Sequence, residues 1–148
     1  MTEASRLRPI VPEPLRSSYD VVVIGGAVMG SSVAWFLSAN PDFDGWSLVV
    51  ERDGSYDFSS TSRTNSCIRQ QFSTEVNIRA SLFGAEFIRN FQSYMGDDPE
   101  VPEIFLDDFG YMYLADDTAF ESALRDSQAL QESLGAGTKI MTPAQIAE

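Results

Sequence analysis

Three glycines and one glutamate in the chain have the types and spacing of a phosphate- and ribose-binding site. Gly25, Gly26 and Gly30 form the pattern G-G-A-x-x-G, so Ala27 stands where G-x-G-x-x-G has its second glycine. Gly25 suits a tight turn, and Gly30 suits close packing of a helix on a strand. The N–H groups that open such a helix attract a pyrophosphate, so the pattern predicts a dinucleotide ligand.

Glu51 lies 21 positions after Gly30. This is close to the spacing of about 20 residues at which a carboxylate binds the ribose hydroxyls in such sites. A carboxylate accepts hydrogen bonds from both hydroxyls and repels a 2′-phosphate, so the expected ligand is FAD or NAD rather than NADP. The alternative is that the glycines only make a sharp turn and that Glu51 is a solvated strand end.

A strand, a helix and a second strand are needed to bring these residues together. The runs 19–24 and 46–51 are apolar on both faces, which is typical of strands buried in a parallel sheet. Small and apolar residues dominate 28–39, which predicts a helix close to that sheet, so residues 19–51 predict one β-α-β unit. Two parallel strands leave sheet edges unpaired. We therefore expect a truncated chain, whose fold a missing C-terminal region or a partner subunit completes.

Beyond the serine-rich loop 53–71, apolar spacing and capping signals predict three helices. They cover residues 75–95, 118–134 and the stretch from Thr142 onward. Two short strands are expected between them, over 109–115 and 139–141. We divide the chain into an N-terminal extension (1–18), the N-terminal part of a dinucleotide-binding domain (19–95) and the beginning of a substrate domain (96–148).

Composition excludes several other functions. The formal net charge of −12 disfavours nucleic acid as a partner, and no run approaches the ~20 apolar residues of a membrane helix. The chain has no histidine, which excludes histidine-based triads and most zinc sites, and we name no metal site. The single cysteine, Cys67, forms no internal disulfide and fits a reducing compartment. We expect a cytoplasmic protein rather than one of the mitochondrial matrix, because residues 1–18 contain acidic side chains.

The loop and helix after Glu51 resemble a known family. The stretches "VVERD", "SSTSRTNSCIRQQFS" and "EVNIRASLFGAEFIRNF" are similar to the D-amino-acid oxidase superfamily of FAD-dependent oxidoreductases. The resemblance runs from about residue 19 to residue 148 and covers only the first part of a family member. It implies an α/β fold, in which the N-terminal part of a Rossmann-like βαβ FAD-binding domain precedes the start of an α+β substrate domain.

The resemblance also implies site roles by position. The pyrophosphate turn would consist of Gly25, Gly26, Ala27, Val28, Met29 and Gly30. Glu51 would hold the adenosine ribose, with Arg52 beside it. Four small polar residues would lie along the phosphates and the flavin edge, namely Ser60, Thr61, Asn65 and Ser66. The alternative for each of these four is a solvated loop. Arg63 and Arg69 are further candidates for binding phosphate or a substrate carboxylate.

By the same resemblance, the complete protein oxidises the C–N bond of an amine or N-methylated amino acid by hydride transfer to flavin. The FAD should be non-covalent, because family members with a histidyl link use a histidine in this region, and Cys67 does not match the cysteinyl position. We name no catalytic residue and expect this segment alone to turn over no substrate. The alternatives are an NAD-binding dehydrogenase domain and a non-catalytic flavoprotein-like fragment or assembly factor.

Overall fold

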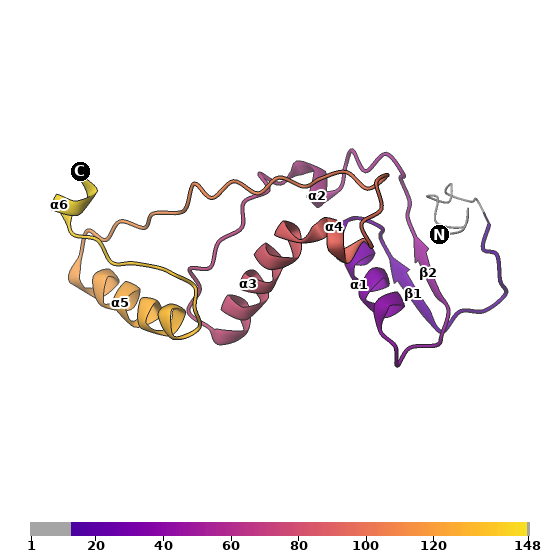
Figure 1. Cartoon of the computed structure of the whole chain (residues 1–148), viewed down its shortest axis with the longest axis horizontal. Coiled ribbons are helices and arrows are strands. Elements are labelled where there is room, and N and C mark those ends of the chain that lie inside the picture. The colour runs from indigo at the N-terminus through magenta and orange to yellow at the C-terminus, as the bar shows by residue number, and fades with distance from the viewer. Residues whose placement is uncertain (1–12, 148) are drawn as a thin grey trace. The chain divides into compact units, whose positions relative to one another are not determined.

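A computed structural model describes residues 13–147, which form two compact units, one ending at Ser66 and the other beginning at Cys67. The first unit contains β1 (Val21–Ile24), α1 (Val28–Ala39), β2 (Ser47–Val50) and α2 (Ser60–Arg63) (Figure 1). The second contains α3 (Glu75–Arg89), α4 (Phe91–Tyr94), α5 (Thr118–Ser133) and α6 (Pro143–Ile146). Most of the predicted N-terminal extension lies outside the described residues, and the predicted domain boundary near residue 96 stays a prediction.

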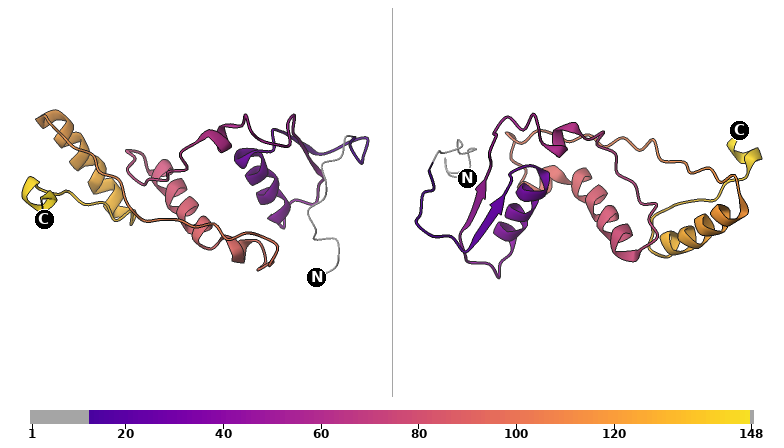
Figure 2. Two further views of the ribbon diagram at one scale, coloured as in Figure 1. Left: turned by 90° about the horizontal axis from the view of Figure 1, so that it is seen from above. Right: turned by 180° about the vertical axis from the view of Figure 1, so that it is seen from behind.

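The predicted β-α-β unit is confirmed. β1 and β2 are parallel neighbours, with Val21 opposite Ser47 and Ile24 opposite Val50. α1 covers the residues predicted for it and packs against both strands, as the views of this unit show (Figures 1 and 2). In a parallel unit of this kind, the carboxyl ends of the strands and the N-terminus of the helix meet at one edge. The glycine turn and Glu51 lie at that edge.

The two strands are less buried than the sequence predicts. Along β1, half-buried Val21 and Val23 alternate with Val22 and Ile24, which are 53% and 89% exposed. A Cβ added to Gly30 of α1 would lie 3.1 Å from Val23 Cγ1, so Val23 is on the face that the helix covers. In this unit α1 covers one face of β1 and β2, and the side chains of Val22 and Ile24 stay exposed. The expectation of burial on both faces is therefore wrong for the described residues.

The second unit has a small core between its helices. Ile78 and Ala85 of α3 and Gln131 of α5 are its buried side chains among the described residues. The Gln131 side-chain amide donates to the Phe72 carbonyl at 2.9 Å, which ties α5 to the chain that precedes α3. The helix predicted over 75–95 is divided at Asn90 into α3 and α4. No helix of the part that the structure describes is long and apolar enough to span a membrane.

The helix starts predicted near residues 118 and 142 are confirmed with one change. The pattern Thr118-x-x-Glu121 predicts a capping box with Thr118 as the N-cap, but α5 is capped by Asp117, whose carboxylate accepts from the Phe120 N–H at 2.7 Å. α6 begins with the capping box that Thr142 and Gln145 form.

The strands predicted over 109–115 and 139–141 are not formed. Segment 109–115 is held by hydrogen bonds from side chains, not by backbone hydrogen bonds to a neighbouring strand. Arg69 Nη1 donates to Tyr113 Oη at 2.5 Å, and Gln71 Nε2 donates to the Tyr111 carbonyl at 2.8 Å. The β-propensity of tyrosine is realised only where a neighbouring strand pairs with its backbone. No such neighbour occurs in the described part of this unit.

Gly30→Ala tests the approach of α1 to the end of β1. The added Cβ would lie 1.8 Å from the Gly25 carbonyl oxygen, so the helix would have to move away from the strand. We expect the free energy of unfolding of the first unit to fall by about 1–3 kcal/mol. Both tryptophans, Trp35 and Trp46, lie in this unit, so urea unfolding followed by tryptophan fluorescence measures the change.

Gly84→Ala is the matched control, because nothing lies within 4 Å of a Cβ added at that position of α3. It should stabilise the helix by about 0.5–1 kcal/mol, measured by far-UV circular dichroism, and leave the fluorescence transition unchanged. A Gly30→Ala protein with the wild-type fluorescence midpoint would contradict the close approach.

Candidate functional site

The turn between β1 and α1 brings the predicted glycines together. Gly25 has a φ of +95°, which side chains rarely adopt, and its N–H donates to the Val50 carbonyl at 2.8 Å. Ala27 is the N-cap residue of α1 and has an extended backbone, with a φ of −68°. Gly30 lies one helical turn later, against the Gly25 carbonyl. Gly25 thus makes the turn, and Gly30 allows the helix to approach it.

The N-terminus of α1 presents backbone donors at this turn, because the first N–H groups of a helix have no carbonyl partner within it. The Val28 N–H donates to Thr61 Oγ1 of α2 at 3.2 Å. None of the described hydrogen bonds uses the N–H of Ala27, Met29 or Gly30. Three backbone donors and the positive end of the helix dipole therefore favour an anion here, such as a phosphate.

Glu51 joins the end of β2 to the glycine turn. Its Oε2 accepts from the Gly26 N–H at 2.7 Å, and its Oε1 accepts from the Asp53 N–H at 2.8 Å. The bond from Asp53, followed by that from Gly26, lowers the pKa of Glu51 below its usual value of 4.5. The side chain is therefore ionised at neutral pH. A carboxylate has about four lone-pair positions, so about two are left for the hydroxyls of a ligand.

The other predicted loop residues lie around α2. Ser60 and Thr61 are the first two residues of α2, and Thr61 reaches the turn through its bond to Val28. Arg52 is exposed beside Glu51. Asn65 and Ser66 follow α2 at the end of the unit, where the Ser66 N–H donates to Thr64 Oγ1 at 3.3 Å. The described hydrogen bonds thus place Thr61 at the turn and keep Ser66 within its own loop.

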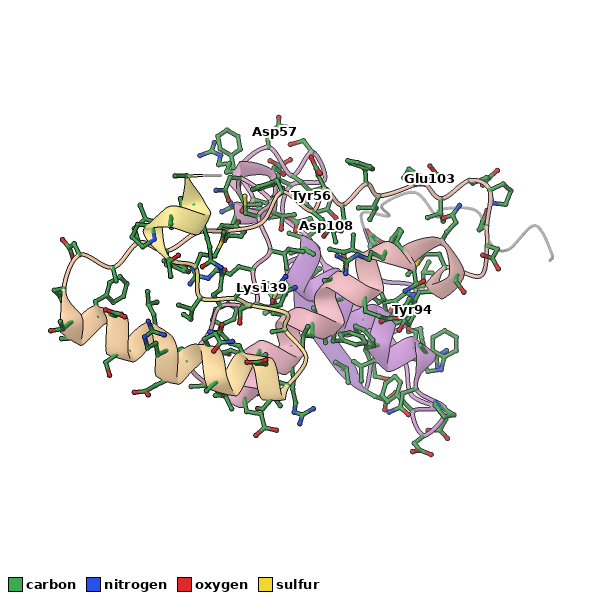
Figure 3. All side chains as sticks on the ribbon, turned by 60° about the vertical axis from the view of Figure 1, so that its left-hand side comes forward. Tyr56, Asp57, Tyr94, Glu103, Asp108 and Lys139 are labelled. Carbon is green, nitrogen blue, oxygen red and sulfur yellow. The ribbon has the colours of Figure 1, made fainter. Side chains whose placement is uncertain are left out.

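One residue beside the turn carries no sequence signal. Tyr56 lies in the loop before α2, next to Asp57 (Figure 3). A Cβ added at Gly26 would lie 2.9 Å from the Tyr56 hydroxyl. No motif marks a single tyrosine in a serine-rich loop, and its place depends on how the loop folds. Arg63 braces the same loop, because its Nε donates to the Asp57 carbonyl at 3.2 Å.

Arg69, the second candidate arginine, is held by aromatic side chains of the second unit. Besides its bond to Tyr113, its guanidinium lies 5.0 Å from the centre of the Phe72 ring. A hydrogen bond with Cys67 raises the pKa of the neighbouring Tyr111, and desolvation raises it further. These contacts hold segment 67–72 against segment 109–113. The contacts of Arg69 with Tyr113 and Phe72 therefore indicate a structural role for this arginine.

The comparisons with known proteins decide the family. Residues 20–148 match the DAO family, which is described as FAD dependent oxidoreductase. The chain belongs to this family. The resemblance to FAD-dependent oxidoreductases is thereby confirmed over nearly the whole sequence. The cofactor of the family is FAD.

Three curated proteins are similar to this chain over nearly the same span of it. FAD-dependent oxidoreductase domain-containing protein 1 of Bos taurus is 38% identical over 131 residues, which cover 86% of this chain and 26% of that protein. The Xenopus laevis protein of the same name is 36% identical over 130 residues, with 86% and 26% covered. The Drosophila melanogaster homolog is 39% identical over 133 residues, with 89% and 25% covered. The chain spans about a quarter of the length of these relatives. No solved structure matches.

The pH dependence of stability tests the bonds that Glu51 makes in this chain. The folded state lowers the pKa of Glu51, so it holds the proton less tightly than the unfolded chain does. The stabilisation is therefore present above the ordinary carboxyl pKa and is lost as the pH falls through the lower folded value. We expect the urea midpoint of the first unit to fall between about pH 6 and about pH 3, and to fall less in Glu51→Gln.

Asp44→Asn serves as the control, because none of the described hydrogen bonds uses the Asp44 carboxylate. This variant should keep the wild-type pH profile in tryptophan fluorescence. If Glu51→Gln also keeps the wild-type profile, the two backbone bonds to this carboxylate do not stabilise the unit.

Proposed function

We propose that this chain forms the part of an FAD site that binds the adenosine ribose and the pyrophosphate. The observation that carries the proposal is the position of Glu51. Its ionised carboxylate is fixed at the glycine turn, beside the donors of α1, in a chain that belongs to an FAD-dependent family. Two lone-pair positions at the carboxylate and free N–H groups at the helix suit the two hydroxyls and the anionic bridge of that ligand.

The individual roles follow the order of the chain. The pyrophosphate contacts the turn, which consists of Gly25, Gly26, Ala27, Val28, Met29 and Gly30. Glu51 accepts from the ribose hydroxyls, and Arg52 lies beside the adenosine. The remaining contacts come from the loop around α2, namely Ser60, Thr61, Asn65 and Ser66. Thr61 supports this order best, because its hydroxyl already lies at the helix N-terminus.

The reaction that we propose for the complete protein is oxidation of a C–N bond in an amine or N-methylated amino acid. Bound flavin supplies the redox chemistry, and the protein places the cofactor and shields it. The chain has no histidine, and Cys67 is occupied with Tyr111, which supports non-covalent attachment. Family membership supports an oxidoreductase. The substrate class and a cytoplasmic location stay part of the proposal.

A titration with FAD tests the proposal. Wild-type protein should bind FAD with saturation, measured by visible absorbance and by quenching of flavin fluorescence, and should show no saturable binding of NAD. Glu51→Gln removes the charge that accepts from the ribose, so we expect the Kd for FAD to rise about tenfold or more. Ser60→Ala removes one neutral hydroxyl near the same loop and should raise the Kd by no more than about threefold.

Two results would count against the proposal in different ways. A wild-type chain that binds no FAD would contradict the function proposed for this chain. Tight FAD binding with the same Kd in Glu51→Gln would leave FAD as the ligand and remove Glu51 from the ribose site. Far-UV circular dichroism of each variant separates loss of binding from loss of fold.

A further inference from the structure

The side chain of Tyr56 reaches the centre of the proposed site from the loop before α2. A Cβ placed on Gly26 would lie 2.9 Å from the Tyr56 hydroxyl and 3.4 Å from Glu51 Cβ. Gly26 is the residue whose N–H donates to the Glu51 carboxylate. The phenol hydroxyl and the Glu51 side chain therefore approach the same residue of the proposed pyrophosphate turn.

The backbone of Tyr56 is held firmly in a conformation that a tyrosine rarely adopts. Its φ is +59°, a region that costs about 1–3 kcal/mol for a residue with a side chain unless its surroundings enforce it. Here the Tyr56 N–H donates to the Asp53 carbonyl at 3.1 Å. The Tyr56 carbonyl accepts from the Ser59 N–H at 2.9 Å and from Ser62 Oγ at 2.7 Å. These three bonds fix the backbone from which the side chain reaches Gly26.

The hydroxyl of Tyr56, by contrast, makes none of the described hydrogen bonds, although the residue is half-buried. A partly buried phenol usually finds a hydrogen-bond partner. A strained backbone that holds this hydroxyl beside two proposed ligand-binding residues indicates that a ligand atom is its partner.

We propose that Tyr56 is a ligand-binding residue whose hydroxyl hydrogen bonds to the adenosine diphosphate half of the dinucleotide. Its position beside Gly26, where Glu51 also bonds, places the contact near the junction of the ribose and the pyrophosphate. A phenol is a good donor to oxygen atoms of either group. The inference rests on the proposed function, and it adds a side-chain donor that the glycine pattern and the ribose carboxylate do not include.

Tyr56→Phe tests this contact with two probes, FAD and ADP, in the 148-residue chain. The variant keeps the ring and the backbone bonds and removes only the hydroxyl. We expect the Kd for both probes, measured by titration calorimetry, to rise by about fivefold, because ADP carries the same half of the ligand. Tyr19→Phe is the matched control. Its hydroxyl lies in the same unit, accepts from the Arg16 N–H at 3.1 Å and should leave both Kd values unchanged.

Tyr56→Asn separates the contact from the strain. Asparagine tolerates a positive φ better than tyrosine does, so this variant should unfold at the wild-type urea concentration or above it. It should nevertheless bind both probes at least fivefold more weakly, since its short amide does not reach the same place. A stable variant with weakened binding would show that the phenol serves the ligand and is not needed for the fold.

The outcomes distinguish this inference from the proposed function. If the wild-type chain binds neither FAD nor ADP, the proposed function fails and the inference fails with it. If the wild-type chain binds both FAD and ADP and Tyr56→Phe has the same Kd values, the proposed function stands and the Tyr56 hydroxyl makes no contact with the ligand. A loss that affects FAD and spares ADP would also overturn the inference, because the contact would then lie on the flavin side.

Discussion

The hydrogen bond from the Gly26 N–H to the Glu51 carboxylate is the constraint on which the first unit depends. Ile24 of β1 is opposite Val50 of β2, so the residues that follow each strand emerge side by side. The Gly25 N–H continues the ladder to the Val50 carbonyl, and the Glu51 side chain then closes on Gly26. A shift of register by one residue would turn Glu51 to the other face and break this closure.

The same bond makes it possible to place an anionic ligand beside an anionic side chain in a chain with a net charge of −12. Two backbone N–H groups face the Glu51 carboxylate, and three others at the start of α1 stay unused. The donors are thus divided between the carboxylate and the place proposed for the pyrophosphate. Thr61 fits this division. Its oxygen accepts from the Val28 N–H, and its own hydroxyl hydrogen is left to donate to a phosphate oxygen.

Features governed by neighbouring residues could be predicted from the sequence, and features that require a distant partner could not. The bounds of α1 and the parallel pairing of its strands follow from apolar runs, glycine positions and spacing within some thirty residues. α5 begins at residue 118 as predicted, and its N-cap is the preceding Asp117 because an aspartate at that position can accept from the first free N–H groups of the helix. Segment 109–115 has the residues of a strand, but no described strand pairs with it. The position of Tyr56 depends on three hydrogen bonds within its loop, which no local sequence pattern predicts.

The degenerate glycine pattern G-G-A-x-x-G has a physical explanation in this geometry. Ala27 is the N-cap of α1 with an ordinary φ of −68°, so its backbone does not require a glycine there. The crowding falls one residue earlier, where Tyr56, Glu51 and Val49 all lie within 3.4 Å of the Cβ that Gly26 lacks. A glycine at position 26 leaves room for the Tyr56 hydroxyl and the Glu51 Cβ that approach it. If Tyr56 binds the ligand, the shifted glycine and the unpredicted tyrosine are two parts of one arrangement. The alanine is then tolerated because the side chains that approach the turn do so at its neighbour.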